Sequence, residues 1–141
     1  MTGSGPVRDT PTRQDEELSL RFAATPQNIA PARHAVADRA RSDGLPDALV
    51  DTIALAVSEA MTNAVVHGFK ESDGGYVEVT AGSQGSGFVI TVCDDGSGMV
   101  PRPDSPGLGL GLPIIAQLAA SLDVRSNPGG AGTQICMTFA A

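Results

Sequence analysis

The 141-residue chain contains no tryptophan, one tyrosine and four phenylalanines, so aromatic residues make up only 4% of it. Hydrophobic residues nevertheless reach 41%, enough for one domain whose core consists of Ala, Val, Leu and Ile. Basic residues are also few, because nine Lys and Arg stand against sixteen Asp and Glu, a formal net charge of −7. An acidic chain lacks the positive surface that nucleic acids require, so we expect no direct nucleic-acid partner, although a nucleotide is easier to accommodate.

Only two cysteines occur, Cys93 and Cys136, both in apolar strand-like segments and neither with metal-ligand spacing. We interpret them as buried, reduced thiols of a cytoplasmic protein. No apolar run approaches the length that spans a membrane, and the N-terminus lacks the hydrophobic stretch of a signal peptide, so we expect no membrane partner. Gly, Pro, Thr and charged residues fill the first segment, which predicts a mobile tail at 1–17 and one folded domain at 18–141.

The hydrophobic pattern predicts a strand, two helices, two strands, a loop, a third helix and two final strands. Hairpin-linked strands with helices grouped between them are typical of an α+β two-layer sandwich, whose mixed, mostly antiparallel sheet carries the helices on one face. The segment 96–111 holds five Gly and three Pro and is therefore expected to be a loop. The expected strands lie at 18–22, 76–82, 87–95, 123–127 and 133–140, and the expected helices at 27–42, 46–67 and from 110 or 112 to 120.

Three polar side chains recur every four residues near the end of the second predicted helix: Glu59, Asn63 and His67. Four residues turn an α-helix by about 400°, so the three share one face. A solvated polar face explains such a row, and spacing alone favours that interpretation. However, the residues between them are mostly apolar, and a carboxylate with an amide supplies oxygen ligands that suit Mg²⁺. We expect this helix to pack through its other face, which carries Leu49, Ile53, Val57, Ala60 and Ala64.

In the segment "CDDGSGM", Asp94 ends an apolar strand and is followed by Gly96 and Gly98. An acidic turn that closes a strand explains this pattern. Alternatively, Asp94 accepts a hydrogen bond from an amino group, and the two glycines let the backbone approach a flat ligand.

Alternate glycines in "GLGLGL" (107–112) precede a predicted helix. Free N–H groups at a helix N-terminus bind phosphate, but a flexible hinge explains the same residues. The spacing matches neither a Rossmann fingerprint nor a P-loop. In "GAGT", Gly132 and Thr133 lead into the last strand, for which a turn is the default interpretation.

Taken in order, the four segments resemble the nucleotide-binding domain shared by gyrase-type ATPases, heat-shock-90 chaperones, histidine kinases and mismatch-repair ATPases. "EAMTNAVVH" is similar to the N-box of this superfamily, "DDGSG" to its first glycine box, "GLGLGL" to its second and "GT" to its last motif. The resemblance covers about residues 18–140 and implies a Bergerat-type ATP-binding fold. Within the superfamily, "LAVSEAMTNAVVHGF" most resembles the anti-sigma-factor serine kinases, which are stand-alone domains of about this length.

The resemblance implies a role for each matching residue. Asn63 would bind Mg²⁺, Glu59 would act as the general base, and Asp94 would accept a hydrogen bond from the adenine amino group. His67 would contact phosphate or cap the helix end. The other implied ATP-binding positions are Gly96, Gly98, Met99 and Thr133 around the adenine, and Gly107, Leu108, Gly109, Leu110 and Gly111 around the phosphates.

By the same resemblance, the expected protein is a cytoplasmic, ATP-dependent serine/threonine kinase. It would phosphorylate an anti-sigma-factor antagonist and sequester a sigma factor, and it would form a homodimer as many family members do. Two alternatives stay open: a nucleotide-gated regulatory binding protein with little kinase activity, and a slow ATPase. The segment between Gly98 and Gly107 is short and holds three prolines that stiffen it, which favours the first alternative.

Overall fold

The computed structural model describes residues 16–67, 75–95, 108–126 and 132–140, with the side chains of 66–67 and 108–112 outside that description. Most of the predicted tail and of the glycine-rich loop therefore lies outside the described residues, and the domain boundary at 17 stays a prediction. The elements are β1 (Leu18–Ala23), the 3₁₀ helix η1 (Pro26–Asn28), α2 (Ile29–Ser42), α3 (Asp47–His67), β2 (Tyr76–Gln84), β3 (Gly87–Asp94), α4 (Leu108–Leu118), β4 (Ser121–Ser126) and β5 (Thr133–Ala140).

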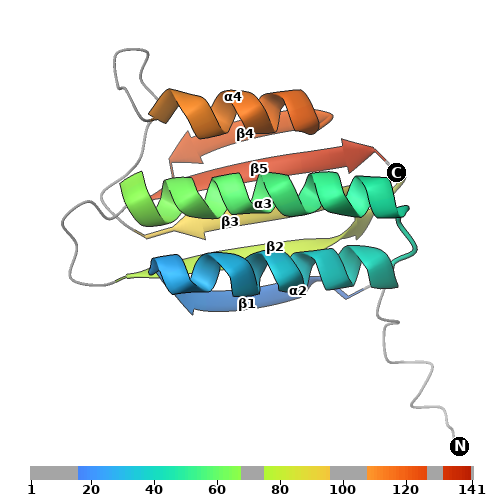
Figure 1. Cartoon of the computed structure of the whole chain (residues 1–141), viewed down its shortest axis with the longest axis horizontal. Coiled ribbons are helices and arrows are strands. Elements are labelled where there is room, and N and C mark those ends of the chain that lie inside the picture. Colours follow the sequence, from blue (N-terminus) through green and yellow to red (C-terminus); the bar gives the residue numbers. More distant parts are fainter. Residues whose placement is uncertain (1–15, 68–74, 96–107, 127–131, 141) are drawn as a thin grey trace, which may run out of the picture.

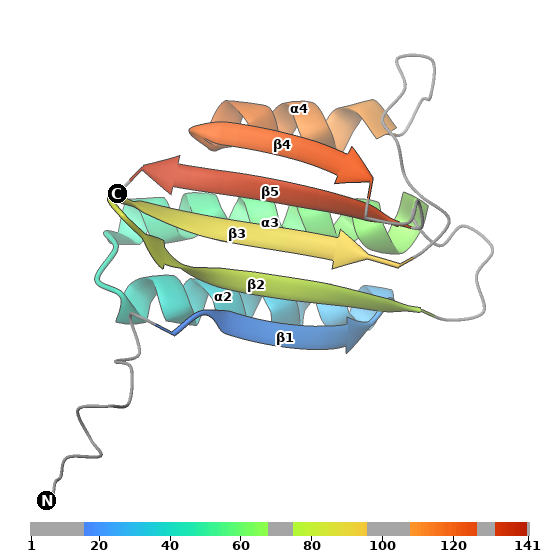
Figure 2. The same ribbon diagram turned by 180° about the vertical axis from the view of Figure 1, so that it is seen from behind.

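The five strands form one sheet in the order β1-β2-β3-β5-β4, and every described pair of neighbours is antiparallel. Helices α2, α3 and α4 lie side by side on one face of this sheet, and the view from behind shows the other face without a helix (Figures 1 and 2). The predicted α+β two-layer sandwich is confirmed.

The two faces of the sheet differ in burial because side chains alternate along each strand. In β3 and β5 every second residue is buried, and the residues between them are half-buried, except Ala140 at the end of β5, which is exposed. The buried set faces the helices and forms the core together with the apolar residues of α2 and α3. A two-residue turn joins β2 to β3, and Gly85 has a φ of 60° there, a conformation that favours glycine at the first position of such a hairpin.

Helix α4 departs from the sequence prediction. It begins at Leu108 and ends at Leu118, so Gly109 and Gly111 belong to its first turns and not to a loop. Glycine lowers the intrinsic helix preference of this segment, and the sequence pattern therefore placed the start too late. Pro113 lies inside the helix and has no N–H to donate to the carbonyl of Gly109, which leaves the first turn less firmly bonded to the rest.

The structure contains a buried ion pair at the end of α2 that the sequence pattern does not predict. Arg39 Nε donates to Asp43 Oδ1 at 3.0 Å, with the two side chains only 7% and 0% exposed. Asp43 Oδ2 accepts a second hydrogen bond from the Ser83 hydroxyl at 2.7 Å, which joins α2 to the end of β2. Hydropathy assigns both charged residues to the surface, so only the tertiary structure reveals the pair.

The expectation that no apolar run is long enough to span a membrane is wrong. The segment Asp47–Val65 of α3 is long and apolar enough to cross one, judged by length and composition alone. Half of this segment is buried inside the fold, where it contacts α2, α4 and three strands. A helix that is apolar on most sides is also typical of a domain core.

Candidate nucleotide-binding site

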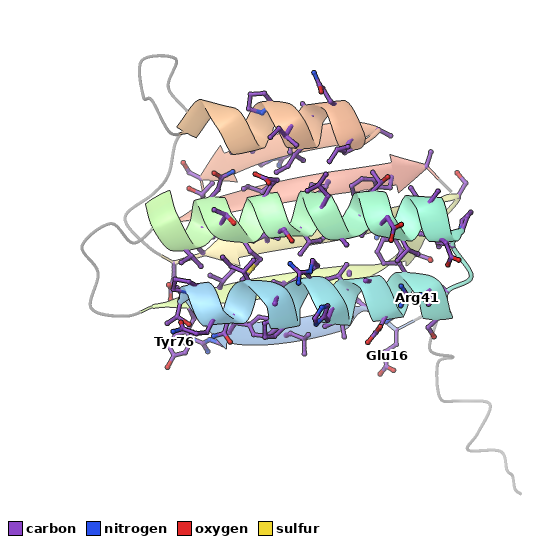
Figure 3. All side chains as sticks on the ribbon, in the orientation of Figure 1. Glu16, Arg41 and Tyr76 are labelled. Carbon is purple, nitrogen blue, oxygen red and sulfur yellow. The ribbon has the colours of Figure 1, made fainter. Side chains whose placement is uncertain are left out.

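The sequence motifs meet at one end of the molecule. Strand β3 ends there, β5 begins there, α3 reaches its C-terminus and α4 its N-terminus (Figure 1). Helix α3 contacts β3 and β5 directly and packs along α4. Figure 3 shows Tyr76 at this end of the molecule, with Glu16 and Arg41 at the other.

Asp94 and Thr133 lie directly opposite each other in the β3–β5 ladder. Their exposed fractions are 3% and 1%, on strand positions that alternate with the open face, so both belong to the helix-covered face. Gly132 has a φ of 86° just before Thr133, and this left-handed backbone favours glycine. The structure thus brings together a carboxylate and a hydroxyl that lie 39 positions apart in sequence.

Asn63 is only 3% exposed, so a solvated polar face does not explain it. The expectation that α3 packs only through its other face is wrong at this position, because Ala60, Met61, Ala64 and Val65 around it are buried as well. Its Nδ2 atom is buried and has no hydrogen-bond partner among the residues that the structure describes. Buried amides almost always have partners, so this exception requires an explanation.

Glu59 lies one helical turn before Asn63 and is half-buried. Its neighbour Ser58 accepts a hydrogen bond from Arg33 Nη1 of α2 at 3.3 Å. This bond ties the two helices together beside Glu59. A half-buried carboxylate next to a buried amide keeps access to solvent or to a ligand, as a proton acceptor requires.

The first turn of α4 supplies a different kind of group. The first four N–H groups of a helix have no partner inside the helix, and its dipole favours anions there. In α4 these N–H groups belong to Leu108, Gly109, Leu110 and Gly111. Two glycines in this turn let an anion approach the backbone closely.

The remaining predicted positions stay predictions. Gly96, Gly98, Met99 and Gly107 lie outside the described residues, as do the side chains of His67, Leu108 and Leu110.

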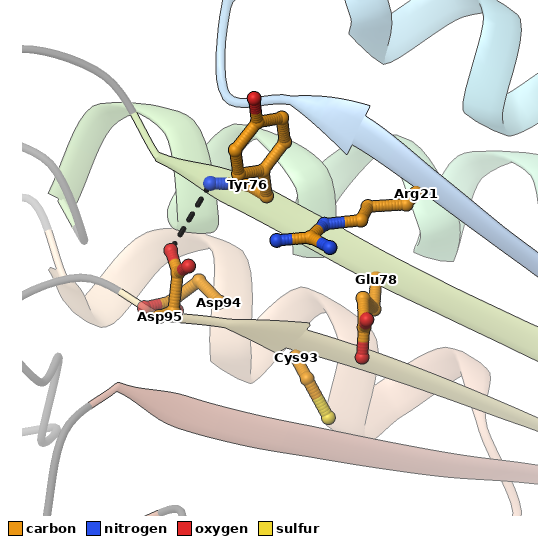
Figure 4. Close-up of a pocket in the computed structure, with 6 residues that line it drawn as sticks. All are labelled: Arg21, Tyr76, Glu78, Cys93, Asp94 and Asp95. Carbon is orange, nitrogen blue, oxygen red and sulfur yellow. Dashed lines mark hydrogen bonds between the residues drawn. The ribbon is translucent and has the colours of Figure 1, made fainter.

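The structure adds a second feature at the same end, on the open face of the sheet. A cavity of about 150 Å³ is lined by Arg21, Tyr76, Glu78, Cys93, Asp94 and Asp95 (Figure 4). The Arg21 guanidinium lies 4.3 Å from the centre of the Tyr76 ring. Burial raises the pKa of the Cys93 thiol above its usual range, and the charges of Glu78 and Asp94 and the neighbouring Cys136 add to this effect. No single segment of the sequence signals this cavity, because its residues come from three strands.

The family described as "Histidine kinase-like ATPase domain" matches residues 22–139. The chain belongs to the histidine kinase-like ATPase family. The resemblance inferred from the sequence motifs is confirmed.

Curated relatives narrow the position within this ATPase family. An anti-sigma F factor of Clostridium acetobutylicum is 31% identical over 134 residues, covering 87% of this chain and 92% of the relative. The anti-sigma F factor of Bacillus subtilis is 31% identical over 134 residues, covering 86% and 90%. That of Pasteuria penetrans is 35% identical over 133 residues, covering 85% and 87%.

A solved structure confirms the fold. The RsbU and RsbW domains of a Mycobacterium tuberculosis protein superpose with a TM-score of 0.69 at 20% identity. The match covers 89% of this chain and 32% of that longer one. At this identity the likeness concerns the fold alone.

The residues present fit the Mg²⁺ and ATP that the ATPase family implies. A half-turn of the Asn63 amide exchanges Nδ2 with Oδ1, and the amide could then turn an oxygen toward a metal from the position for which the described ranges supply no hydrogen-bond partner. Within the described ranges, no three His, Cys, Asp or Glu side chains gather as a metal site.

Proposed function

We propose that the protein is an ATP-binding anti-sigma factor that phosphorylates a serine or threonine of an antagonist protein and sequesters a sigma factor. The family assignment and the anti-sigma F relatives support this proposal. We further propose that it acts in the cytoplasm, as a homodimer, without direct contact with nucleic acid or membrane.

One observation supports the nucleotide site above the others: the buried Asn63 amide nitrogen, for which the described part of the chain supplies no hydrogen-bond partner. An unsatisfied buried polar group costs about 1–3 kcal/mol of stability. A ligand that pairs with this group would remove that cost. Asn63 lies near the C-terminus of α3, which reaches the end of the molecule where β3 ends, β5 begins and α4 has its N-terminus (Figure 1).

The adenine would lie against the paired ends of β3 and β5. There the Asp94 carboxylate would accept a hydrogen bond from the exocyclic amino group of the adenine. Thr133, on the neighbouring strand, would offer its hydroxyl to the same base. The phosphates would extend toward the first turn of α4, whose free N–H groups donate to their oxygens. Asn63 would hold Mg²⁺, which supplies charge neutralisation at the phosphates.

Glu59 would accept the proton of the attacking serine or threonine hydroxyl. Its half-buried position one turn before Asn63 supports this role, because a carboxylate there keeps access to solvent or to a ligand. The hydrogen bond between Arg33 and Ser58 holds the adjoining turn of α3 in place while this transfer occurs.

Two other functions compete with this proposal: a nucleotide-gated binding protein with little kinase activity, and a slow ATPase. Incubation with γ-labelled ATP, Mg²⁺ and candidate antagonist proteins distinguishes all three. We expect label on the antagonist. Free labelled phosphate without labelled antagonist would support the ATPase, and nucleotide-dependent sigma-factor capture without either product would support the binding protein. The Glu59→Gln variant is the matched control, since it keeps the size of the side chain and removes the proton acceptor.

A further inference from the structure

The end of the β2–β3 hairpin carries a hydrogen bond that the strand ladder does not require. The last ladder pair is Val77 with Asp94. Beyond it, the N–H of Tyr76 donates to the side-chain Oδ1 of Asp95 at 3.0 Å (Figure 4). The N–H of Asp95 donates to the Tyr76 carbonyl at 3.4 Å, which is long for an N–H···O bond. The carboxylate of Asp95 therefore supplies the shorter of the two bonds that fasten β3 to β2 here.

Tyr76 is itself held from the other side. It pairs with Ala23 at the end of β1, and the Arg21 guanidinium lies over its ring. The attraction between a cation and the face of an aromatic ring restrains the Tyr76 side chain. Asp95 is thus fastened to a residue that the neighbouring strand already fixes.

Asp94 and Asp95 differ in burial. Asp94, the last residue of β3, is only 3% exposed, whereas Asp95 follows the strand and is exposed where its carboxylate accepts from the Tyr76 N–H. One peptide bond joins the two residues, so a constraint on Asp95 also restricts rotation of the Asp94 backbone. The strength of a hydrogen bond falls steeply with misalignment, so this rotation decides how well Asp94 meets a base.

We propose that Asp95 is a positioning residue of the nucleotide pocket, which fixes the direction of the Asp94 carboxylate by clamping the end of β3 to Tyr76. The inference rests on the proposed function, in which Asp94 accepts the adenine amino group. Loss of the clamp lets the end of β3 fray, and the bound state must then order it again. We expect Asp95→Ala to weaken binding of ATP and ADP about five- to tenfold, the effect of one hydrogen bond.

Calorimetric titration with ADP, well below the unfolding temperature, tests the clamp. Asp95→Asn keeps an oxygen acceptor for the Tyr76 N–H and should bind ADP as the wild type does. Glu78→Gln is the matched control. It removes a carboxylate from the same cavity and leaves the bond between Asp95 and the Tyr76 N–H in place. Equal losses in Asp95→Asn and Asp95→Ala would overturn the clamp, since the effect would then come from charge.

A second pair of variants tests the same hydrogen bond by changing its donor, the backbone N–H of Tyr76. Tyr76 is the first residue of β2, a position where proline is tolerated. Tyr76→Pro removes both the backbone N–H and the aromatic ring, whereas Tyr76→Ala removes only the ring and keeps the N–H. We expect the proline variant to bind ADP more weakly than the alanine variant does. Equal affinities of the two variants for ADP would contradict the proposal.

A double-mutant cycle separates this inference from the proposed function. If Asp95 acts through Asp94, then Asp95→Ala should have almost no further effect in an Asp94→Asn background. Additive losses would overturn the positioning role and leave Asp94 in the site. An Asp94→Asn variant that binds ADP as tightly as the wild type would overturn the site assignment itself, and the inference with it.

Discussion

Replacing Asn63 with alanine should make the nucleotide-free protein more stable. The side chain is 3% exposed, and its Nδ2 atom is buried without a hydrogen-bond partner in the described parts of the chain. Most substitutions of buried residues destabilise a protein, by about 1 kcal/mol on average. We expect Asn63→Ala to stabilise the protein instead, because the substitution removes the unsatisfied amide.

The magnitude combines three contributions. Removing an unsatisfied buried polar group relieves about 1–3 kcal/mol. Alanine has the better helix propensity, which adds up to about 0.7 kcal/mol in the interior of α3. Against this, a residual cavity the size of one water, about 30 Å³, costs about 0.7 kcal/mol. The free energy of unfolding should therefore rise by roughly 0.3–3 kcal/mol, and Tm by roughly 1–10 °C.

Urea unfolding with and without Mg²⁺ and ATP measures both sides of this prediction. Nucleotide at 100 times its Kd stabilises the wild type by about 2.7 kcal/mol. The Asn63→Ala variant should gain much less, because it lacks the proposed Mg²⁺ ligand. The variant should thus gain stability without ligand and lose its advantage when Mg²⁺ and ATP are added.

Two results would refute this reasoning. A variant less stable than the wild type by more than about 1 kcal/mol without nucleotide would show that Asn63 is a structural residue, since that is the ordinary cost of a core substitution. Equal stabilisation of both proteins by Mg²⁺ and ATP would remove Asn63 from the metal site.

Four further predictions concern other residues. Glu59→Gln should spare ATP affinity and slow phosphoryl transfer by about 10²–10⁴-fold in single-turnover assays, the contribution of a positioned general base; unchanged rates would exclude that role. Asp94→Asn should weaken ATP binding by about 1.5–3 kcal/mol in calorimetry, and the wild type should bind GTP poorly, so equal affinity for ATP and GTP would contradict the assignment. Asp43→Ala should lower the free energy of unfolding by about 3–5 kcal/mol, because it leaves the buried Arg39 charge without its partner; a loss under 1 kcal/mol in urea unfolding would contradict this. Because burial raises the pKa of the Cys93 thiol, the folded state holds this proton more tightly than the unfolded chain does. Stability should then fall as pH rises above about 8.5, the ordinary thiol pKa, and Cys93→Ala should flatten that decline.

Local patterns were sufficient to predict the elements of the fold. The alternation in β2, β3 and β5 and the helical periodicity in α2 and α3 depend only on residues close in sequence, and all five elements occur where the sequence placed them to within a few residues. The ordered motifs likewise identified the family, because each motif is a short segment with its own backbone demands. The start of α4 was misplaced, since its glycines oppose the helix that the rest of the fold supports.

Tertiary structure decided which of these residues meet and which are buried. Asp94 and Thr133 became partners only through the pairing of β3 with β5. Asn63 was expected on a face away from the core, yet packing of α3 against neighbours on several sides buried it.

The same holds for the contacts that no motif announced. The Arg39–Asp43 pair is buried only because the end of α2 lies against the end of β2. The bond from Tyr76 to Asp95 joins residues 19 positions apart at the end of a hairpin. Sequence patterns record the preferences of single segments, whereas burial and hydrogen bonding between segments depend on the position of every element in the sheet and its helical layer.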